Sequence, residues 1–186
     1  MNALREPSPG LSGPCRLLVS ACLFGLRCPY QGSPGPAWQN GFSTLLPLMQ
    51  EELRFILFPV CPEQLGGLPT PRPPAELQAS SRAILAGEGK VLTNLGDDVT
   101  ACFLRGAHET LNLAERLKIR GAIFKERSPS CGCGTVYSGS FDGAIINGDG
   151  ITTALLKKYG IIVRESSAIY SQWMITKSLE MLRNMF

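Results

Sequence analysis

The chain has 186 residues, of which 44% are hydrophobic and 18% charged, a balance typical of a globular domain and not of a disordered chain. The net charge of +3 is small, and no run of Lys and Arg indicates a nucleic-acid surface. Seven cysteines, an odd number, argue against a secreted disulfide framework. They leave buried small side chains, or metal ligands in a reducing cytosol, as the alternatives.

Residues 1–14 are rich in Pro, Gly and Ser, which predicts a disordered segment ahead of a single domain at residues 15–186. The apolar run Leu17–Leu26 follows Arg16 as the core of a signal peptide would, but Arg27, Cys28 and Pro29 follow it instead of a small-residue cleavage site. We therefore interpret the run as a buried strand and expect a cytoplasmic protein. No apolar run reaches the roughly 18 residues that span a membrane.

Four short apolar runs without polar alternation predict buried strands of a parallel sheet that is covered on both faces. They are Arg16–Ala21, Arg54–Phe58, Gly121–Lys125 and Ile161–Arg164. Pro59 cannot donate a backbone hydrogen bond, so we expect the pairing of the second strand to stop about there.

Helical spacing of apolar residues falls between these strands. Asp98 is expected to cap a helix that continues to Leu117, with Cys102 on its buried face. Further helices are predicted at Thr152–Tyr159, at Ala168–Arg183 and, around Pro47, at Phe42–Leu53.

The stretch Pro62–Gly96 has no clear helical pattern. Within it, Ala83–Ala86 and Lys90–Thr93 are predicted to form a small hairpin across Gly87–Gly89. Strands that alternate with helices predict a single-domain α/β fold: an open, mostly parallel sheet of the Rossmann or flavodoxin type, flanked by helices, with the hairpin as an insertion.

Three cysteines each follow a predicted strand, namely Cys22, Cys61 and Cys131. Ligand sites of parallel α/β sheets lie beyond the carboxyl ends of the strands, so the three thiols are expected to converge. Their spacings of 39 and 70 residues match neither a zinc knuckle nor a ferredoxin run. Three thiolates would suit zinc, copper(I) or an iron–sulfur cluster with one open iron, and composition does not separate these.

Side chains beside these cysteines supply further chemistry. Glu63, two residues after Cys61, is a candidate general base, with an exposed loop acid as the alternative. Ser128 and Ser130 flank Cys131, where hydroxyls can donate to a substrate or stabilise a turn.

Arg72 lies in a proline-rich segment and is a candidate for binding an anion or the polar edge of a base, with a solvated arginine as the alternative. Cys28 and Cys133 are expected not to be ligands. Of these two, Cys133 is the stronger candidate because it is only two residues from Cys131. Cys15 is expected to have no role.

Three segments resemble the signature segments of the thiouracil desulfidase family, and the likeness extends over about residues 16–165. The segments are Ser20–Gly25, Val60–Arg72 and Lys125–Gly132, with shorter likenesses at Gly96–Thr100 and Gly148–Thr152. Near the expected site the chain departs from the family pattern at Gln31, Cys133 and Ser138, which leaves the identity of the substrate open.

The resemblance implies a [4Fe–4S] cluster held by Cys22, Cys61 and Cys131, whose open iron polarises the C=S bond of a thiolated nucleobase such as 2-thiouracil. It implies a non-redox, hydrolytic desulfidase that releases hydrogen sulfide, with Glu63 and Ser128 as catalytic residues. Arg72 and Ser130 are predicted to bind the substrate.

Two other functions stay open: a non-enzymatic carrier of an iron–sulfur cluster or zinc, and a zinc hydrolase that uses the same three thiolates. The expected partner is a small thio-base, with no nucleic acid and no membrane. A homodimer is left as an open alternative.

Overall fold

The computed structural model describes residues 15–33, 41–51, 53, 55–176 and 184–186. The predictions for residues 1–14 and for the last part of the helix expected at Ala168–Arg183 lie outside these ranges. Within them, no helix combines the length and the apolar character needed to cross a membrane.

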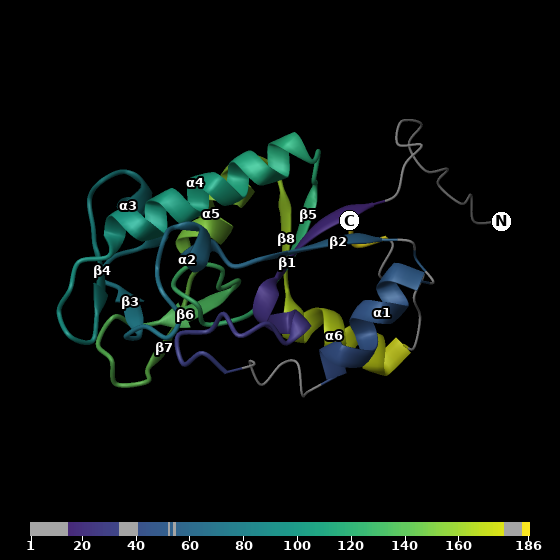
Figure 1. The fold of residues 1–186 in the computed structure, drawn as a ribbon, viewed down its shortest axis with the longest axis horizontal. Coiled ribbons are helices and arrows are strands. Elements are labelled where there is room, and N and C mark those ends of the chain that lie inside the picture. The colour runs from purple at the N-terminus through teal and green to yellow at the C-terminus, as the bar shows by residue number, and fades with distance from the viewer. Residues whose placement is uncertain (1–14, 34–40, 52, 54, 177–183) are drawn as a thin grey trace.

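A parallel sheet of four strands forms the centre of the described part of the chain (Figure 1). Its order is β2-β1-β5-β8, and each neighbouring pair is parallel. The strands are β1 (Arg16–Ser20), β2 (Ile56–Val60), β5 (Gly121–Phe124) and β8 (Ile162–Glu165). The predicted α/β fold with a mostly parallel sheet is confirmed.

Helices cover both faces of this sheet (Figure 1). Helices α4 (Thr100–Arg116) and α5 (Ile151–Lys158) lie on one face, and α1 (Ser43–Glu51) and α6 (Ser166–Thr176) lie on the other. Along β1, Leu18 packs into the core on the α4 side, whereas Leu17 and Val19 pack into the core on the α1 side. Since both faces are buried, the strands show no polar alternation.

Some boundaries differ from the prediction. Strand β2 begins at Ile56 and continues through Pro59, whose neighbour Val60 is in register with Ser20. The proline is tolerated because β2 is the edge strand and needs no hydrogen-bond partner on its outer side.

Helix α4 starts later than predicted. Its N-cap residue is Val99, although an Asp98 carboxylate oxygen accepts a hydrogen bond from the Thr100 amide at 3.0 Å. Cys102, which the sequence assigned to the core, is only half-buried and belongs to neither core cluster of the described residues.

The hairpin predicted for Ala83–Ala86 and Lys90–Thr93 is wrong. Residues Ser81–Leu85 form helix α3, because the Ser80 hydroxyl accepts a hydrogen bond from the Ala83 amide and Ile84 is fully buried. An apolar run this short does not distinguish a strand from a helix.

The other half of the predicted hairpin has a different partner. Strand β4 (Val91–Thr93) pairs antiparallel with β3 (Ala75–Leu77), while β6 (Thr135–Tyr137) and β7 (Ile145–Asn147) form an unpredicted antiparallel pair. A short helix, α2 (Pro62–Leu65), also lies in the stretch where no helix was expected.

Helix α2 packs against α4 at a point where neither backbone leaves room for a side chain. A Cβ atom at Gly66 would clash with the Cys102 carbonyl oxygen, and one at Gly106 would clash with the Pro62 carbonyl oxygen. These two glycines therefore determine how closely α2 approaches α4, and with it the position of Glu63.

We expect Gly106→Ala to lower the free energy of unfolding by roughly 1–3 kcal/mol, because the new methyl group overpacks the contact between the helices. Glu109→Ala, at an exposed position of the same helix, should change it by less than about 0.5 kcal/mol. Chemical denaturation of both variants measures the difference. Equal stability of the two variants would contradict the close packing.

Candidate functional site

The three cysteines predicted to converge line one cavity of about 530 Å³. Cys22 lies in a short 3-10 helix, η1 (Ala21–Phe24), directly after β1; Cys61 directly follows β2; and Cys131 lies in a turn beyond β5. Because β2, β1 and β5 are parallel neighbours, their carboxyl ends meet at the same edge of the sheet.

A fourth thiol also lines this cavity. It belongs to Cys28, whereas Cys133, the stronger candidate by sequence, does not line it. Cys133 is buried in the core, where its thiol donates to the Val163 carbonyl at 3.8 Å. The sequence ranking of these two cysteines is therefore reversed in space.

Hydrogen bonds among the thiols divide them into donors and acceptors. The Cys28 thiol has one proton, which it can donate to either Cys22 or Cys61, and its proximity lowers the pKa of both, that of Cys61 to about 7. The same interactions raise the pKa of Cys28. Burial raises the pKa of Cys131 to about 12, although Ser20 donates a hydrogen bond to its sulfur at 3.4 Å. Two of the four sulfurs are thus prepared to act as thiolates.

A lysine compensates this gathering of negative charge. Burial disfavours the charged form of Lys125, but the combined attraction of Cys22, Cys131, Glu63 and Glu126 outweighs that cost and raises the pKa of Lys125. Lys125 directly follows β5 and was the last residue of the predicted strand Gly121–Lys125. That place was the available signal, yet the sequence analysis assigned it no role.

The donor set of the cavity is chemically soft. Thiols suit an iron–sulfur cluster, zinc or copper(I), the alternatives that the sequence left open for Cys22, Cys61 and Cys131. Among the described residues, no group of three or more His, Cys, Asp and Glu side chains is arranged to hold a single metal ion.

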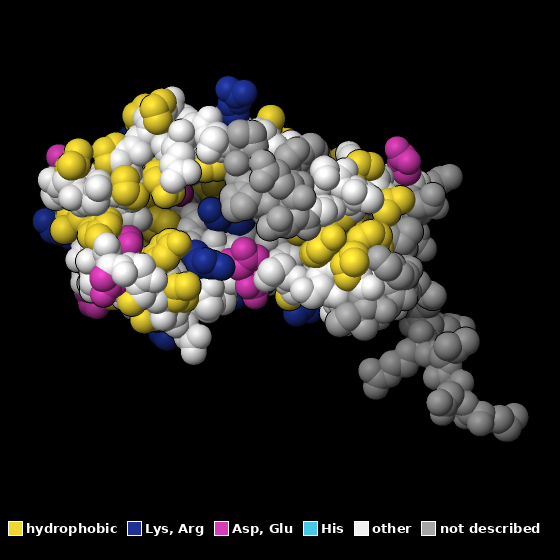
Figure 2. Space-filling model, turned by 90° about the horizontal axis from the view of Figure 1, so that it is seen from below, with side chains coloured by type: hydrophobic (Ala, Val, Ile, Leu, Met, Phe, Trp, Pro, Cys, Tyr) yellow, Lys and Arg dark blue, Asp and Glu magenta, His cyan; other side chains and the backbone are white. Residues whose placement is uncertain are grey.

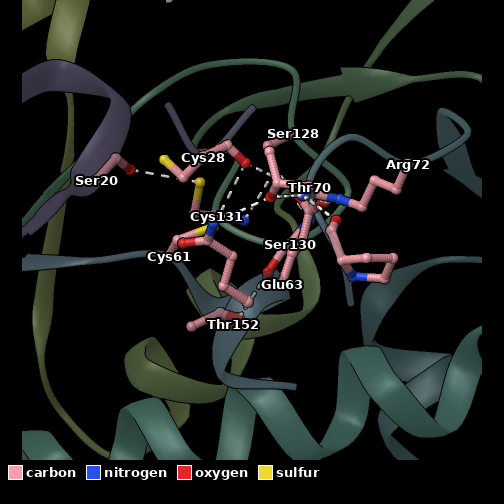
Figure 3. Close-up of polar contacts among 12 residues, drawn as sticks. Ser20, Cys28, Cys61, Glu63, Thr70, Arg72, Ser128, Ser130, Cys131 and Thr152 are labelled. Carbon is pink, nitrogen blue, oxygen red and sulfur yellow. Dashed lines mark hydrogen bonds and ion pairs between the residues drawn. The ribbon is translucent and has the colours of Figure 1, made fainter. Parts of the chain in front are cut away.

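Glu63 lies beside the thiols, with each of its carboxylate oxygens held by a different partner (Figure 3). Oε2 accepts from the Arg72 guanidinium at 2.7 and 2.8 Å, and Oε1 accepts from the Ser128 hydroxyl at 3.2 Å. The Glu63 side chain keeps 15% of its surface exposed and lines the cavity, so its carboxylate can still reach a small molecule there.

Arg72, predicted to bind the substrate, lines the cavity, but its guanidinium is directed at protein acceptors. Its side chain is 5% exposed, and its guanidinium donates to Glu63, to the Pro69 carbonyl, to the Thr70 hydroxyl and to the Cys28 carbonyl. A guanidinium has five N–H donors, and these contacts use all of them. Arg72 therefore joins the Glu63 carboxylate to the Cys28 backbone.

Ser128 orients the turn that carries Cys131. Its hydroxyl accepts hydrogen bonds from the Ser130 and Cys131 amides, both at 3.2 Å, while it donates to Glu63. Ser130 does not line the cavity; it is 1% exposed and its hydroxyl bonds to that of Thr152 at 3.1 Å. Of the two serines, only Ser128 faces the candidate site.

Helix α5 also holds the turn that carries Cys131. Backbone amides at the start of this helix donate to carbonyls of the turn: Gly150 to Gly132, Ile151 to Pro129, and Thr152 to Ser130. These bonds satisfy donors that a helix start otherwise leaves without partners. They also fix the position of the turn, and with it Cys131, relative to α5.

Figure 2 shows a hollow near the middle of one face, in which basic and acidic side chains meet. The cavity with the thiols is likewise rich in charge. Its charged lining residues are Glu63, Arg72, Glu76, Lys125, Glu126 and Arg127. The thiols are therefore surrounded by charged side chains.

Comparisons with known proteins agree with this picture. The model of the 2-thiouracil desulfurase family matches residues 17–167. The uncharacterized protein YbbK of Bacillus subtilis (strain 168) is 41% identical over 145 residues, which cover 77% of this chain and 91% of YbbK. The solved structure of the [4Fe–4S]-dependent thiouracil desulfidase TudS is similar with a TM-score of 0.71 and 40% identity, covering 88% of this chain and 98% of TudS.

We expect the thiols to react differently with iodoacetamide when the metal-free, reduced protein is tested from pH 5 to 9. Alkylation of Cys61 should rise about tenfold per pH unit and level off near pH 7, because the thiolate is the nucleophile. Cys131 should react slowly, and its alkylation rate should still be rising at pH 9.

Cys15, also half-buried but with a pKa that burial raises, is the matched control. Peptide mass spectrometry follows each site, and identical profiles for Cys61 and Cys15 would contradict the hydrogen bond from Cys28.

Proposed function

Because this chain belongs to the 2-thiouracil desulfurase family, we propose that it removes sulfur from a thiolated nucleobase such as 2-thiouracil and releases hydrogen sulfide. The observation that carries the proposal is the cavity in which Cys22, Cys61 and Cys131 meet Glu63 and Ser128. The similarity to TudS, over 88% of this chain, supports the same reaction class. Replacing C=S by C=O consumes one water and yields one hydrogen sulfide, so no oxidant is needed.

The soft thiol set fits a [4Fe–4S] cluster, which Cys22, Cys61 and Cys131 would hold. When bound, a cluster with three protein ligands supplies an iron that can act as a Lewis acid toward the sulfur of the substrate. The Lys125 ammonium offsets the negative charge of the thiolates. Cys28 would remain beside them as a protonated thiol.

Glu63 is the proposed general base. Its carboxylate would accept a proton from the water that attacks the carbon of the C=S group. Ser128 donates to that carboxylate and can pass a proton between it and the substrate. Arg72 becomes a positioning residue in this proposal, because its donors are all directed at protein acceptors. Ser130 is a second positioning residue, since it supports the turn through Thr152.

The carrier alternative fits these observations less well. A protein that hands over a metal or cluster needs accessible thiols, whereas Cys22 and Cys131 are each 7% exposed. The cavity beside them has room for a small planar molecule. Visible absorbance of the purified protein separates the cluster from the zinc alternative, because a cluster absorbs visible light and zinc does not.

The first test concerns the cluster. Protein purified without oxygen should contain about four irons and four sulfides per chain. Cys22→Ala should lose most of this iron, while Cys102→Ala, which alters a half-buried cysteine outside the cavity, should keep it. Iron and sulfide are quantified by colorimetric assay. A Cys22→Ala protein with undiminished iron would remove Cys22 from the ligand set.

The second test concerns the base. Glu63→Gln should retain its iron and lose roughly 10²-fold or more in the rate of sulfide release from 2-thiouracil, because the amide cannot accept the proton. Glu88→Gln removes the same charge at an exposed position and should leave the rate unchanged. Anaerobic assay of sulfide gives both rates. If wild-type protein with its iron releases no sulfide from any thio-base, the proposed function fails.

A further inference from the structure

Two aromatic side chains at the cavity are not explained by the chemistry above. Among the described residues, the large hydrophobic side chains that are both exposed and part of the cavity lining are Tyr30, 42% exposed, and Phe141, 38% exposed. They come from segments more than a hundred residues apart. Covering an exposed aromatic ring with an apolar ligand surface is energetically favourable. The presence of two such rings at the same cavity therefore indicates a ligand with a flat apolar surface.

The backbone at Phe141 is held in an uncommon conformation. Its φ of 55° lies in the left-handed region, which costs free energy in a residue other than glycine. The other non-glycine residues with positive φ are Lys118, just past the end of α4 where this is ordinary, and Arg127, which also lines the cavity. Two of the three such residues in the described ranges therefore lie at the cavity.

Glu76 on β3 maintains this conformation. One oxygen of its carboxylate accepts from the Gly139 amide at 2.9 Å and from the Phe141 amide at 3.1 Å, and the residue is only 8% exposed. The Gln78 side chain also donates to the Gly139 carbonyl at 2.9 Å. Since a buried carboxylate is costly unless it is bonded, the loop and Glu76 depend on each other.

Tyr30 is anchored to the other wall of the site. Its carbonyl accepts from the Arg72 amide at 2.9 Å, and the turn that carries it is closed by a bond from the Gly32 amide to the Pro29 carbonyl at 2.8 Å. The backbone that carries the Tyr30 ring is therefore hydrogen-bonded to Arg72, whose side chain in turn donates to Glu63.

We propose that Tyr30 and Phe141 bind the planar ring of the substrate by stacking, and that Glu76 acts as a positioning residue for Phe141. This inference rests on the proposed function and restricts the substrate to conjugated, flat heterocycles. A ring saturated at C5 and C6, as in 5,6-dihydrouracil, is puckered there and offers less flat π surface to an aromatic side chain. Stacking would also let one cavity accept thio-bases with different substituents, because every base has a π face.

The test measures binding by calorimetry on anaerobically purified protein with its iron, using uracil, which has no sulfur to lose, and 5,6-dihydrouracil. Wild-type protein should bind uracil the more tightly. Phe141→Ala should weaken uracil binding roughly tenfold and remove most of the preference over dihydrouracil, and Phe141→Tyr should retain both. Ile146→Ala, at an exposed position of the same hairpin outside the cavity, is the matched control and should bind as wild type does.

Glu76 is tested through its coupling to Phe141. Glu76→Ala should weaken uracil binding in the wild-type background but add little in the Phe141→Ala background, because the first change acts through the second residue. Glu76→Gln keeps an oxygen acceptor for the two amides and should restore part of the affinity. Iron content and circular dichroism confirm that each variant is folded.

The outcomes separate this inference from the function. Uracil binding that is unchanged in Phe141→Ala, equally weakened in Ile146→Ala, or absent in wild-type protein overturns the stacking proposal. Sulfide release with an unchanged KM in Phe141→Ala leaves the function standing and removes the stacking role. If uracil binding depends on Phe141 but the protein releases no sulfide from 2-thiouracil, the stacking role stands and the proposed function fails.

Discussion

Parallel pairing of β1 with both β2 and β5 is the constraint on which the site depends. The register that sets Ser20 opposite Val60 places the residues after these two strands, Cys22 and Cys61, at one edge of the sheet. Strand β5 pairs on the other side of β1 and leads to Lys125 and the turn with Cys131. A strand reversed or displaced by one position would separate these groups, so the site and the sheet are inseparable.

Gathering several thiolates and a carboxylate in a partly buried cavity is electrostatically costly, and the surrounding residues offset that cost. The Lys125 ammonium lies near the thiols, whereas the Arg72 guanidinium pairs with Glu63. The two groups of the proposed reaction, the thiols and the base, thus each lie beside a cation, and Lys125 is attracted by Glu63 as well as by the thiols.

The second layer of the site consists mostly of backbone contacts. The amides at the start of α5 hold the turn of Cys131, and the contact between α2 and α4 through Gly66 and Gly106 holds Glu63. Glu76 does the same for the loop of Phe141. Contacts with regular elements therefore position Cys131, Glu63 and Phe141, which favours a site whose geometry persists through a reaction.

The sequence by itself determined the α/β class, the four buried strands and the convergence of Cys22, Cys61 and Cys131, because uninterrupted apolar runs and the residues after them are local signals. It did not identify helix α3, the pairing of β3 with β4, or the pair β6 and β7. The helix has five residues and each of these strands has three, which is too few to show a pattern. Only the tertiary structure decided that Cys28 faces the cavity and Cys133 the core, and that the donors of Arg72 are all engaged. The physical reason is that which way a side chain points, and which acceptors surround it, depends on segments distant in the chain, and spacing along the sequence contains no information about them.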